Sequence, residues 1–225
     1  MSDSLKLAAA EASLEEVEDG MVLGLGTGST AALMIEVLGR RVQQGLQVVG
    51  IPTSERSAAQ ASAVGIPLVD FSTHPRIDLT IDGADEVDPA LNLIKGLGGA
   101  LLREKIVAAA SRRMTVIVDA GKLVPRLGGV RLPVEVVAFG WQATAVRLRA
   151  AGADTVLRHG ADGVAFRTDS GNLILDCAFA CIDDAAALAV QLKAMIGVVE
   201  SGLFIGLATT VIVGTPTGLK KLERA

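Results

Sequence analysis

The amino-acid sequence predicts an α/β protein, in which a mostly parallel sheet carries helices on both faces and holds an inserted small α+β domain. Two observations support this fold class. In the first half of the chain, short continuously apolar segments alternate with helix-like segments, which is typical of parallel strands buried on both faces. After Gly128-Gly129 the pattern changes to strands, helices and a hairpin turn, as in a split β-α-β unit. Half of the 225 residues are apolar, which is enough for a sizeable core.

The elements of the larger domain follow from the apolar pattern. Gly39 suits the end of a helix that begins at Ser29, because glycine is common just past a helix end. Helices are expected at 29–38 and 54–64, and strands at 21–25, 46–51, 66–71, 79–82 and 115–119. This alternation predicts a Rossmann-like parallel sheet.

The elements of the inserted domain are read in the same way. The segment Asp169-Ser170-Gly171-Asn172 predicts a hairpin turn between two strands, and Asp183 or Asp184 is the expected cap of a helix. Strands are expected at 134–137, 164–167, 173–177 and near 198–199, and helices at 142–151 and 183–195. A last strand at 210–213 is expected to rejoin the first sheet. The expected domains are therefore 1–128 with 203–225, Rossmann-like, and 129–202, small and ferredoxin-like.

Composition excludes several classes of protein. The formal net charge is −4, and nucleic-acid binding needs clustered Lys and Arg, so no nucleic-acid partner is expected. The acidic N-terminal segment does not resemble a secretory signal, and no apolar stretch reaches the length of a membrane span. Cys177 and Cys181 are expected to be reduced and mostly buried. His74 and His159 lie far from them without zinc-site spacing, so no metal site is expected. A cytoplasmic protein is predicted.

The first motif, Gly-Leu-Gly-Thr-Gly-Ser-Thr-Ala at 24–31, lies between an expected strand and helix. Glycines let the backbone approach a ligand closely, and the N–H groups at a helix start favour an anion. Thr27, Ser29 and Thr30 add hydroxyl groups, and Gly28 lies among them. The motif predicts an anion-binding loop, and the structural alternative is a tight turn with a Ser or Thr cap.

Two nucleotide-binding alternatives fit this loop less well. A dinucleotide site needs an acidic residue at the end of the second strand to bind a ribose, whereas Ile51-Pro52-Thr53-Ser54 stands there. The Gly-Lys-Ser/Thr ending of a nucleoside triphosphatase loop is also missing. No cofactor is therefore expected.

The second motif, Asp-Gly-Ala-Asp-Glu-Val-Asp at 82–88, follows a strand at the carboxyl edge, where open α/β sheets bind ligands. Four carboxylates this close repel one another, which spreads their pKa values. The alternatives are a solvated acidic loop and a calcium loop, and the spacing of an EF-hand is absent.

The third motif, Lys-Gly-Leu-Gly-Gly-Ala-Leu-Leu-Arg-Glu-Lys at 95–105, is a glycine loop that leads into a helix. Lys95 is suited to an anionic oxygen. Glu104 has apolar residues three and four positions away on either side, and such neighbours raise the pKa of a carboxyl group, as a general base requires. Arg103 and Lys105 have similar neighbours, so a surface glutamate remains the alternative.

The fourth motif, Asp-Ala-Gly-Lys at 119–122, also follows a strand. Lys122 could reach the same edge of the sheet, although a solvated lysine is the simpler interpretation of one lysine alone. Glycine, aspartate, lysine and glutamate at three strand ends together predict one polar cleft for a small anion.

Together these segments resemble ribose-5-phosphate isomerase, type A. Further similar segments are Leu-Pro-Val-Glu-Val at 132–136, Gly-Val-Val-Glu-Ser-Gly-Leu-Phe at 197–204 and Gly-Thr-Pro at 214–216. The resemblance thus spans nearly the whole chain in order. Two departures are Leu97, where the family usually has glycine, and 194–197, where a proline would be expected before Gly197.

The resemblance implies an aldose–ketose isomerisation of ribose 5-phosphate and ribulose 5-phosphate through an enediol, in the pentose phosphate pathway. It implies Glu104 as the proton-transferring base, with Asp82, Asp85 and Lys95 around the reacting end of the sugar. It implies no metal or cofactor, and a homodimer or homotetramer. The implied substrate contacts are Thr27, Gly28, Ser29, Thr30, Gly83, Ala84, Gly96, Leu97, Gly98 and Lys122.

Two other functions use related folds. A non-catalytic sugar-phosphate sensor would normally carry an output module, for which the sequence leaves no room, and fold alone does not fix function. Coenzyme A transfer would use a glutamate nucleophile and a second large domain. Intact Glu104 and Lys95 favour the isomerase.

Overall fold

The computed structural model describes residues 3–224 and contains two compact units. The large unit holds the described residues of 1–84, 103–123 and 206–225, and the small unit holds 85–102 and 124–205. The segment 85–102 therefore belongs with the small unit, although the expected boundaries placed it in the larger domain. The reason is non-local pairing, since the Lys95 N–H donates to the carbonyl of Gly202 at 2.9 Å.

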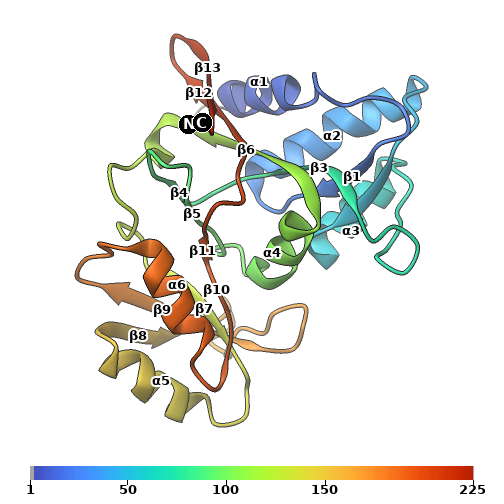
Figure 1. Cartoon of the computed structure of the whole chain (residues 1–225). Coiled ribbons are helices and arrows are strands. Elements are labelled where there is room, and N and C mark those ends of the chain that lie inside the picture. Colours follow the sequence, from blue (N-terminus) through green and yellow to red (C-terminus); the bar gives the residue numbers. More distant parts are fainter. Residues whose placement is uncertain (1–2, 225) are drawn as a thin grey trace. The chain divides into compact units, whose positions relative to one another are not determined.

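The sheet of the large unit is mostly parallel, as predicted (Figure 1). Its strand order is β13-β12-β6-β3-β1-β2, and only the β12–β13 pair is antiparallel. The expected return of the chain to this sheet is confirmed, because β12 lies parallel to β6. The strands are β1 (Val22–Leu25), β2 (Val49–Pro52), β3 (Ile77–Asp82), β6 (Ser111–Asp119), β12 (Thr210–Thr215) and β13 (Gly218–Glu223).

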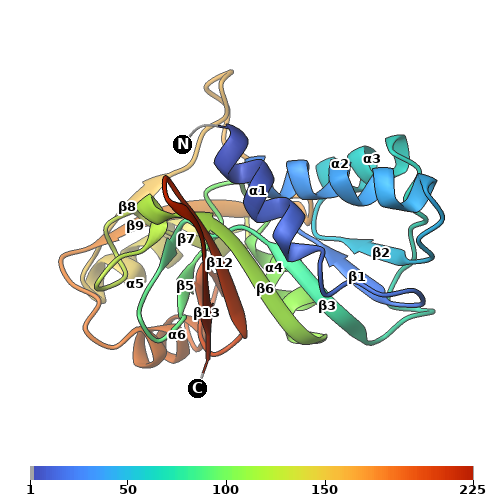
Figure 2. The same cartoon turned by 90° about the horizontal axis from the view of Figure 1, so that it is seen from above.

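Helices cover both faces of this sheet (Figure 2). Leu23 and Leu25 join the core under α1 (Asp3–Ser13), α2 (Ser29–Gln43) and α3 (Glu55–Ala63). Gly24 points to the opposite face, where an added Cβ would lie 2.6 Å from Val107 of α4 (Leu101–Ala109). The two faces follow from the alternation of side chains along a strand.

Two predictions in the large unit are wrong. The helix does not end at Gly39 but runs on to Gln43. The glycine serves close packing instead, because a Cβ added at residue 39 would lie 2.6 Å from the Cβ of Val64. The strand expected at 66–71 is only an isolated bridge between Leu68 and Gly50. Asp70 diverts the chain there, since its carboxylate accepts the Ser72 N–H at 2.9 Å and closes a turn.

The small unit contains a four-stranded antiparallel sheet in the order β10-β7-β9-β8. Its β-α-β-β-α-β sequence of elements is the predicted ferredoxin-like arrangement. Asp184 is the cap of the second helix, since its side chain accepts the Ala187 N–H at 2.9 Å. The elements are β7 (Leu132–Val136), α5 (Trp141–Ala150), β8 (Ala153–Leu157), β9 (Leu173–Phe179), α6 (Ala185–Lys193) and β10 (Val198–Ser201).

The strand expected at 164–167 is wrong, although its hairpin turn is present. The N–H of Thr168 donates to the carbonyl of Asn172 at 3.0 Å, and Gly171 has a φ of 79°. Residues 164–167 form only isolated bridges, and β9 pairs instead with β8. The sequence analysis missed β8, whose exposed Asp154 and Val156 alternate with buried residues.

A second small sheet was also not expected. It has the order β11-β5-β4, with β4 (Glu86–Val87), β5 (Leu93–Ile94) and β11 (Leu203–Phe204). Two-residue strands leave no periodic signal in a sequence. Strand β4 lies within the segment 82–88, and β5 directly precedes the segment 95–105.

The two cysteines differ in environment, and both are free. Cys177 is buried in β9, and burial raises the pKa of its thiol to about 12. Cys181 is exposed, so the expectation of two mostly buried thiols is wrong for it. None of the helices in the described part of the chain combines the length and apolar character needed to cross a membrane.

Candidate active site

Three neighbouring parallel strands of the large unit end in predicted motifs. In the order β6-β3-β1, β1 leads into the loop 26–28, β3 ends at Asp82, and β6 ends at Asp119. Parallel strands present their carboxyl ends at one edge, which is the ligand-binding edge of open α/β sheets. The structure thus brings three of the four motifs to one edge of one sheet.

Asp82 is held against the loop that follows β1. Its side chain is fully buried, and its Oδ1 accepts the N–H groups of Thr27 at 3.0 Å and Gly83 at 2.7 Å. The chain approaches this closely because residue 26 is glycine: an added Cβ would lie 2.3 Å from Asp82 Oδ1. The glycine motif therefore also serves to position a carboxylate.

The hydroxyl of Thr27 has a buried structural setting. Thr27 Oγ1 lies 2.8 Å from Thr53 Oγ1, 2.8 Å from Ser54 Oγ and 2.9 Å from Ser57 Oγ. The Ser57 hydroxyl in turn donates to the carbonyl of Gly26 at 2.7 Å. This cluster fixes the loop at the start of α2, and it explains why hydroxyl residues stand at 53 and 54 where a dinucleotide site would carry an acid.

The N-terminus of α2 carries the other residues of the first motif. Gly28 is the cap, with a φ of 121° and no side-chain cap hydrogen bond, so the predicted alternative of a Ser or Thr cap is wrong. Ser29 is exposed and Thr30 half-buried. The Ser29 hydroxyl accepts a hydrogen bond from Lys6 Nζ of α1 at 3.1 Å.

Lys6 is a candidate that the sequence analysis missed. A single lysine in an acid-rich segment carries no motif signal. It reaches Ser29 because α1 packs on α2, which is a tertiary contact. Its ammonium group adds positive charge beside the loop.

Glu104 lies in the first turn of α4 and is 4% exposed. The neighbours that the sequence identified, Ala100, Leu101, Val107 and Ala108, are all buried as well. Arg103, by contrast, is directed to the surface, where it pairs with Glu55 at 2.6 Å. The surface interpretation of Glu104 is therefore wrong, and the helix presents a buried carboxylate.

The remaining catalytic candidates, Asp85 and Lys95, belong to the small unit. Asp85 Oδ2 accepts the N–H of Leu97 at 2.9 Å. Lys95 is 2% exposed, and its Nζ lies 5.5 Å from the centre of the Phe204 ring, within the range of a cation–π contact. Gly83 and Ala84 precede Asp85 and are half-buried.

The glycine segment 96–98 of the small unit is buried at Gly96 and exposed at Leu97 and Gly98. Gly96 has a φ of 106°, whereas Leu97 is not among the described residues with positive φ. The leucine therefore causes no left-handed strain, and its side chain is 45% exposed. Gly98 is exposed as well.

The other carboxylates of the second motif bind backbone groups. Glu86 is buried and accepts the N–H groups of Gly128 and Val130, each at 2.7 Å. Asp88 Oδ1 accepts those of Ala90 at 2.9 Å and Asn92 at 2.8 Å. The alternative of a solvated acidic loop is therefore wrong, because these acids accept hydrogen bonds from the N–H groups of turns. Among residues 3–224, no group of acids, histidines or cysteines is suited to binding a metal ion.

The fourth motif forms a short 3-10 helix, η1 (Ala120–Lys122). The carboxylate of Asp119 accepts the N–H of Gly121 at 2.9 Å, which assigns this aspartate a capping role. Lys122 is half-buried beside the end of β6.

Comparison with known proteins decides the family. Residues 49–218 match the profile of ribose 5-phosphate isomerase A (phosphoriboisomerase A). The chain belongs to this family. The resemblance predicted from the sequence is confirmed, and the chain is an isomerase.

Individual relatives are similar over their whole length. A ribose-5-phosphate isomerase A from Gloeobacter violaceus is 59% identical over 98% of this chain and 96% of its own. One from Synechococcus sp. (strain JA-3-3Ab) is 52% identical over 100% of this chain and 99% of its own.

Solved structures confirm the α/β fold class. Ribose 5-phosphate isomerase A from Methanocaldococcus jannaschii is 41% identical with a TM-score of 0.95, covering 99% of this chain and 100% of that one. A D-ribose-5-phosphate isomerase in complex with phospho-erythronic acid is 42% identical with a TM-score of 0.96, covering 99% of each chain.

Proposed function

We propose that this isomerase interconverts D-ribose 5-phosphate and D-ribulose 5-phosphate through an enediol or enediolate, with Glu104 as the general base. Family membership supports the substrate and the reaction. The observation that carries the mechanism is the buried carboxylate of Glu104 in the first turn of α4. A buried carboxylate on a helix is held in place and shielded from bulk water, as a positioned general base requires.

The reaction moves one proton between C2 and C1 and others between the oxygens. In the direction from aldose to ketose, Glu104 takes the proton from C2 and delivers it to C1. Asp82, held by two backbone N–H groups, moves protons at the sugar oxygens. Lys95 stabilises the negative charge that develops on the oxygen of the enediolate, and Asp85 orients its neighbours.

Chain connectivity supports a shared role for the two aspartates. They are separated by Gly83 and Ala84 alone, so their Cα atoms are at most about 11 Å apart. A five-carbon sugar phosphate is comparable in length. We therefore assign Gly83, Ala84 and the segment 96–98 to the backbone that contacts the sugar.

We assign the phosphate group to the start of α2. Gly28, Ser29 and Thr30 present helix-start N–H groups and hydroxyls to an anion, and Lys6 adds charge through its contact with Ser29. Thr27 acts there through its backbone and its buried hydroxyl cluster. Lys122, near the end of β6, is a further cation for the same substrate. A relative's complex with phospho-erythronic acid, a phosphorylated acid, supports an anion subsite.

The test is direct. Purified protein is supplied with ribose 5-phosphate in deuterated water, and both ketose formation and deuterium at C2 of recovered aldose are measured. An enediol mechanism with a single base predicts ketose and exchange with solvent. Ketose without any deuterium incorporation would contradict transfer through a carboxyl group whose proton exchanges with solvent, and absence of ketose would contradict the proposed substrate.

We also propose that the enzyme works in the cytoplasm as a homodimer or homotetramer. Two free thiols suit a reducing compartment, and closed symmetric oligomers are the commonest assemblies of soluble enzymes. Sedimentation of the purified protein measures the assembly.

A further inference from the structure

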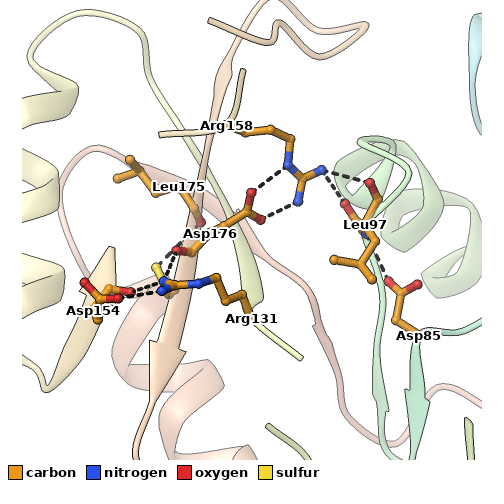
Figure 3. Close-up of polar contacts among 9 residues, drawn as sticks. Asp85, Leu97, Arg131, Asp154, Arg158, Leu175 and Asp176 are labelled. Atoms are coloured by element: carbon orange, nitrogen blue, oxygen red, sulfur yellow. Dashed lines mark hydrogen bonds and ion pairs between the residues drawn. The ribbon is translucent and has the colours of Figure 1, made fainter. Parts of the chain in front are cut away.

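Arg158 of the small unit holds the backbone of the glycine segment (Figure 3). Its Nη1 donates to the carbonyl of Gly96 at 2.9 Å and to the carbonyl of Leu97 at 3.1 Å. The rest of the guanidinium faces Asp176: Nε donates to Oδ2 at 2.9 Å, and Nη2 pairs with Oδ1. One arginine therefore joins a strand of the sheet to the segment that we assign to the substrate.

The contacts at Gly96 and Leu97 have an electrostatic consequence. The carbonyl of Gly96 and the N–H of Leu97 are the two ends of one peptide group. Arg158 binds the carbonyl end, and Asp85 Oδ2 binds the N–H end at 2.9 Å. A cation at the negative end and a carboxylate at the positive end both align this peptide dipole, and hydrogen bonds in such a chain strengthen one another. The chain of contacts runs from Asp176 through Arg158 and the peptide to Asp85.

Arg158 is itself well fixed. It directly follows β8, and Asp176 lies on the paired strand β9, so both side chains start from a sheet. The exposed fractions of the two side chains are 13% and 18%. The Phe166 ring lies 5.9 Å from the guanidinium carbon, and the same ring occupies the space beside Gly99, where an added Cβ would lie 2.4 Å from it. Partial burial makes such a bidentate pair rigid rather than loosely solvated.

We propose that Arg158, held by Asp176, is a positioning residue for the isomerisation: it fixes the peptide 96–97 and, through it, the Asp85 carboxylate. This inference rests on the proposed function, in which Asp85 and the segment 96–98 meet the substrate. Arginine is needed because its planar fork serves four acceptors at once, whereas the lysine ammonium is a point charge with three donors on a flexible stem.

The chain offers a matched control in Arg131. It lies next to the same sheet and pairs with Asp154 at 2.6 Å, as Figure 3 also shows. It donates as well to the carbonyls of Asp154 at 3.0 Å and Asp176 at 3.3 Å. Arg131 thus makes the same kinds of bond in the same unit, but to strands β8 and β9 instead of the glycine segment.

The experiment compares Arg158→Lys, Asp176→Asn and Arg131→Lys in the full chain. Measured are kcat and KM for ribose 5-phosphate, the hydrogen exchange rate of the Leu97 amide by NMR, and the melting temperature. A displacement of about 1 Å in a catalytic group can cost 10²-fold in rate. Arg158→Lys should therefore lower kcat by roughly 10- to 100-fold, with a smaller change in KM. It should also speed Leu97 exchange, and Asp176→Asn should act in the same direction.

Arg131→Lys should leave kcat and Leu97 exchange at wild-type values. The proposal is overturned if Arg158→Lys leaves either kcat or Leu97 exchange unchanged, or if Arg131→Lys reproduces both effects. If Arg158→Lys does not fold, the isosteric Asp176→Asn variant decides between the same outcomes. Failure of the proposed function is a separate result: the wild-type protein would then not convert ribose 5-phosphate, while the exchange measurement would still report on the Arg158 contact.

Discussion

Glu104 acquires its environment from the helix face on which it lies. Its sequence neighbours are as apolar as those of Arg103 and Lys105, so the sequence alone could not choose among the three. The choice is made by packing, which buries Glu104 and directs Arg103 to Glu55 at the surface. Lys6 was beyond prediction for the same reason, since only the packing of α1 on α2 brings it to Ser29.

Glu104→Gln tests the proposed base. Glutamine keeps the size of the side chain but cannot accept a proton from carbon, and a positioned base contributes about 10²- to 10⁴-fold. We expect kcat to fall by that factor with a modest change in KM, and C2 exchange to disappear. The variant should remain folded, as its melting temperature will show. Wild-type kcat and exchange in this variant would make Asp82 or Asp85 the better candidate.

Glu135 of β7 is another buried carboxylate, and the proposed chemistry assigns no role to it. It is fully buried, and its Oε1 accepts hydrogen bonds from Thr168 Oγ1 and Asn172 Nδ2, both at 2.9 Å. Burial raises its pKa, and the nearby charges of Asp169 and Glu200 raise it further. Glu200 stands directly opposite it on β10, and like charges in that position repel.

The raised pKa of Glu135 predicts a pH-dependent stability. The folded protein holds a proton that the unfolded chain releases above its ordinary pKa of 4.5. Stability is therefore lost as pH rises from that value through the folded pKa. Glutamine has no proton to lose, so Glu135→Gln removes this loss of stability. The melting temperature of the variant minus that of the wild type should therefore increase as the pH rises from about 4 to 8. Parallel curves for the two proteins over that range would refute the explanation.

The β1–α2 loop shows how far an element can be predicted. Its place between strand and helix, and its glycines, are readable from the sequence. Its hydroxyl cluster is not, because Thr53 and Ser54 come from the turn between β2 and α3, and Ser57 comes from α3. The same limit applies to two strands. The apolar segment 66–71 does not form the expected strand, because the turn that Asp70 closes outweighs its apolar pattern. Strand β8 has only a weak apolar pattern and forms because it pairs with β9.

Gly26→Ala tests the close approach of this loop to Asp82. The added Cβ would lie 2.3 Å from Oδ1 and 2.6 Å from the Cα of Asp82, so the carboxylate must move. We expect kcat to fall by about 10²-fold and the free energy of unfolding to fall by about 1–3 kcal/mol. Kinetics and urea unfolding measure the two effects.

Gly50→Ala on β2 is the control for Gly26→Ala. Its Cβ would meet the flexible end of Leu25, at 2.5 Å from Cδ1, and would not touch Asp82. It should lower stability while kcat is retained. An equal loss of kcat in both variants would show that the effect at residue 26 is general destabilisation.

The order of the two units along the chain was readable from the sequence, because the change in pattern after residue 128 and the last apolar strand are both local signals. The attachment of 85–102 to the small unit was not, since it depends on contacts to Gly128, Val130 and Gly202 that lie far away in the chain. Edge strand β13 was missed because its side chains are mostly exposed and carry no apolar signal.

For the enzyme as a whole we predict that turnover needs no metal or nucleotide. The proposed proton transfers use carboxylates and a lysine, and the ribose-binding acid and the phosphate-loop lysine of nucleotide sites are missing. After EDTA treatment and dialysis, the rate should equal that of the untreated enzyme. A loss of activity that zinc or magnesium restores would contradict this prediction.

The pairing of β12 with β6 has a consequence for biosynthesis. On the ribosome, β6 emerges before the 124–205 segment of the small unit, and its partner β12 follows only after that segment. At about 5–20 residues per second, the delay is roughly 4 to 16 s. Throughout this interval the nascent chain carries β6, with its apolar centre Val116, Ile117 and Val118, as an open strand edge. Such edges recruit other strands, so the growing polypeptide should be a client of chaperones until β12 arrives.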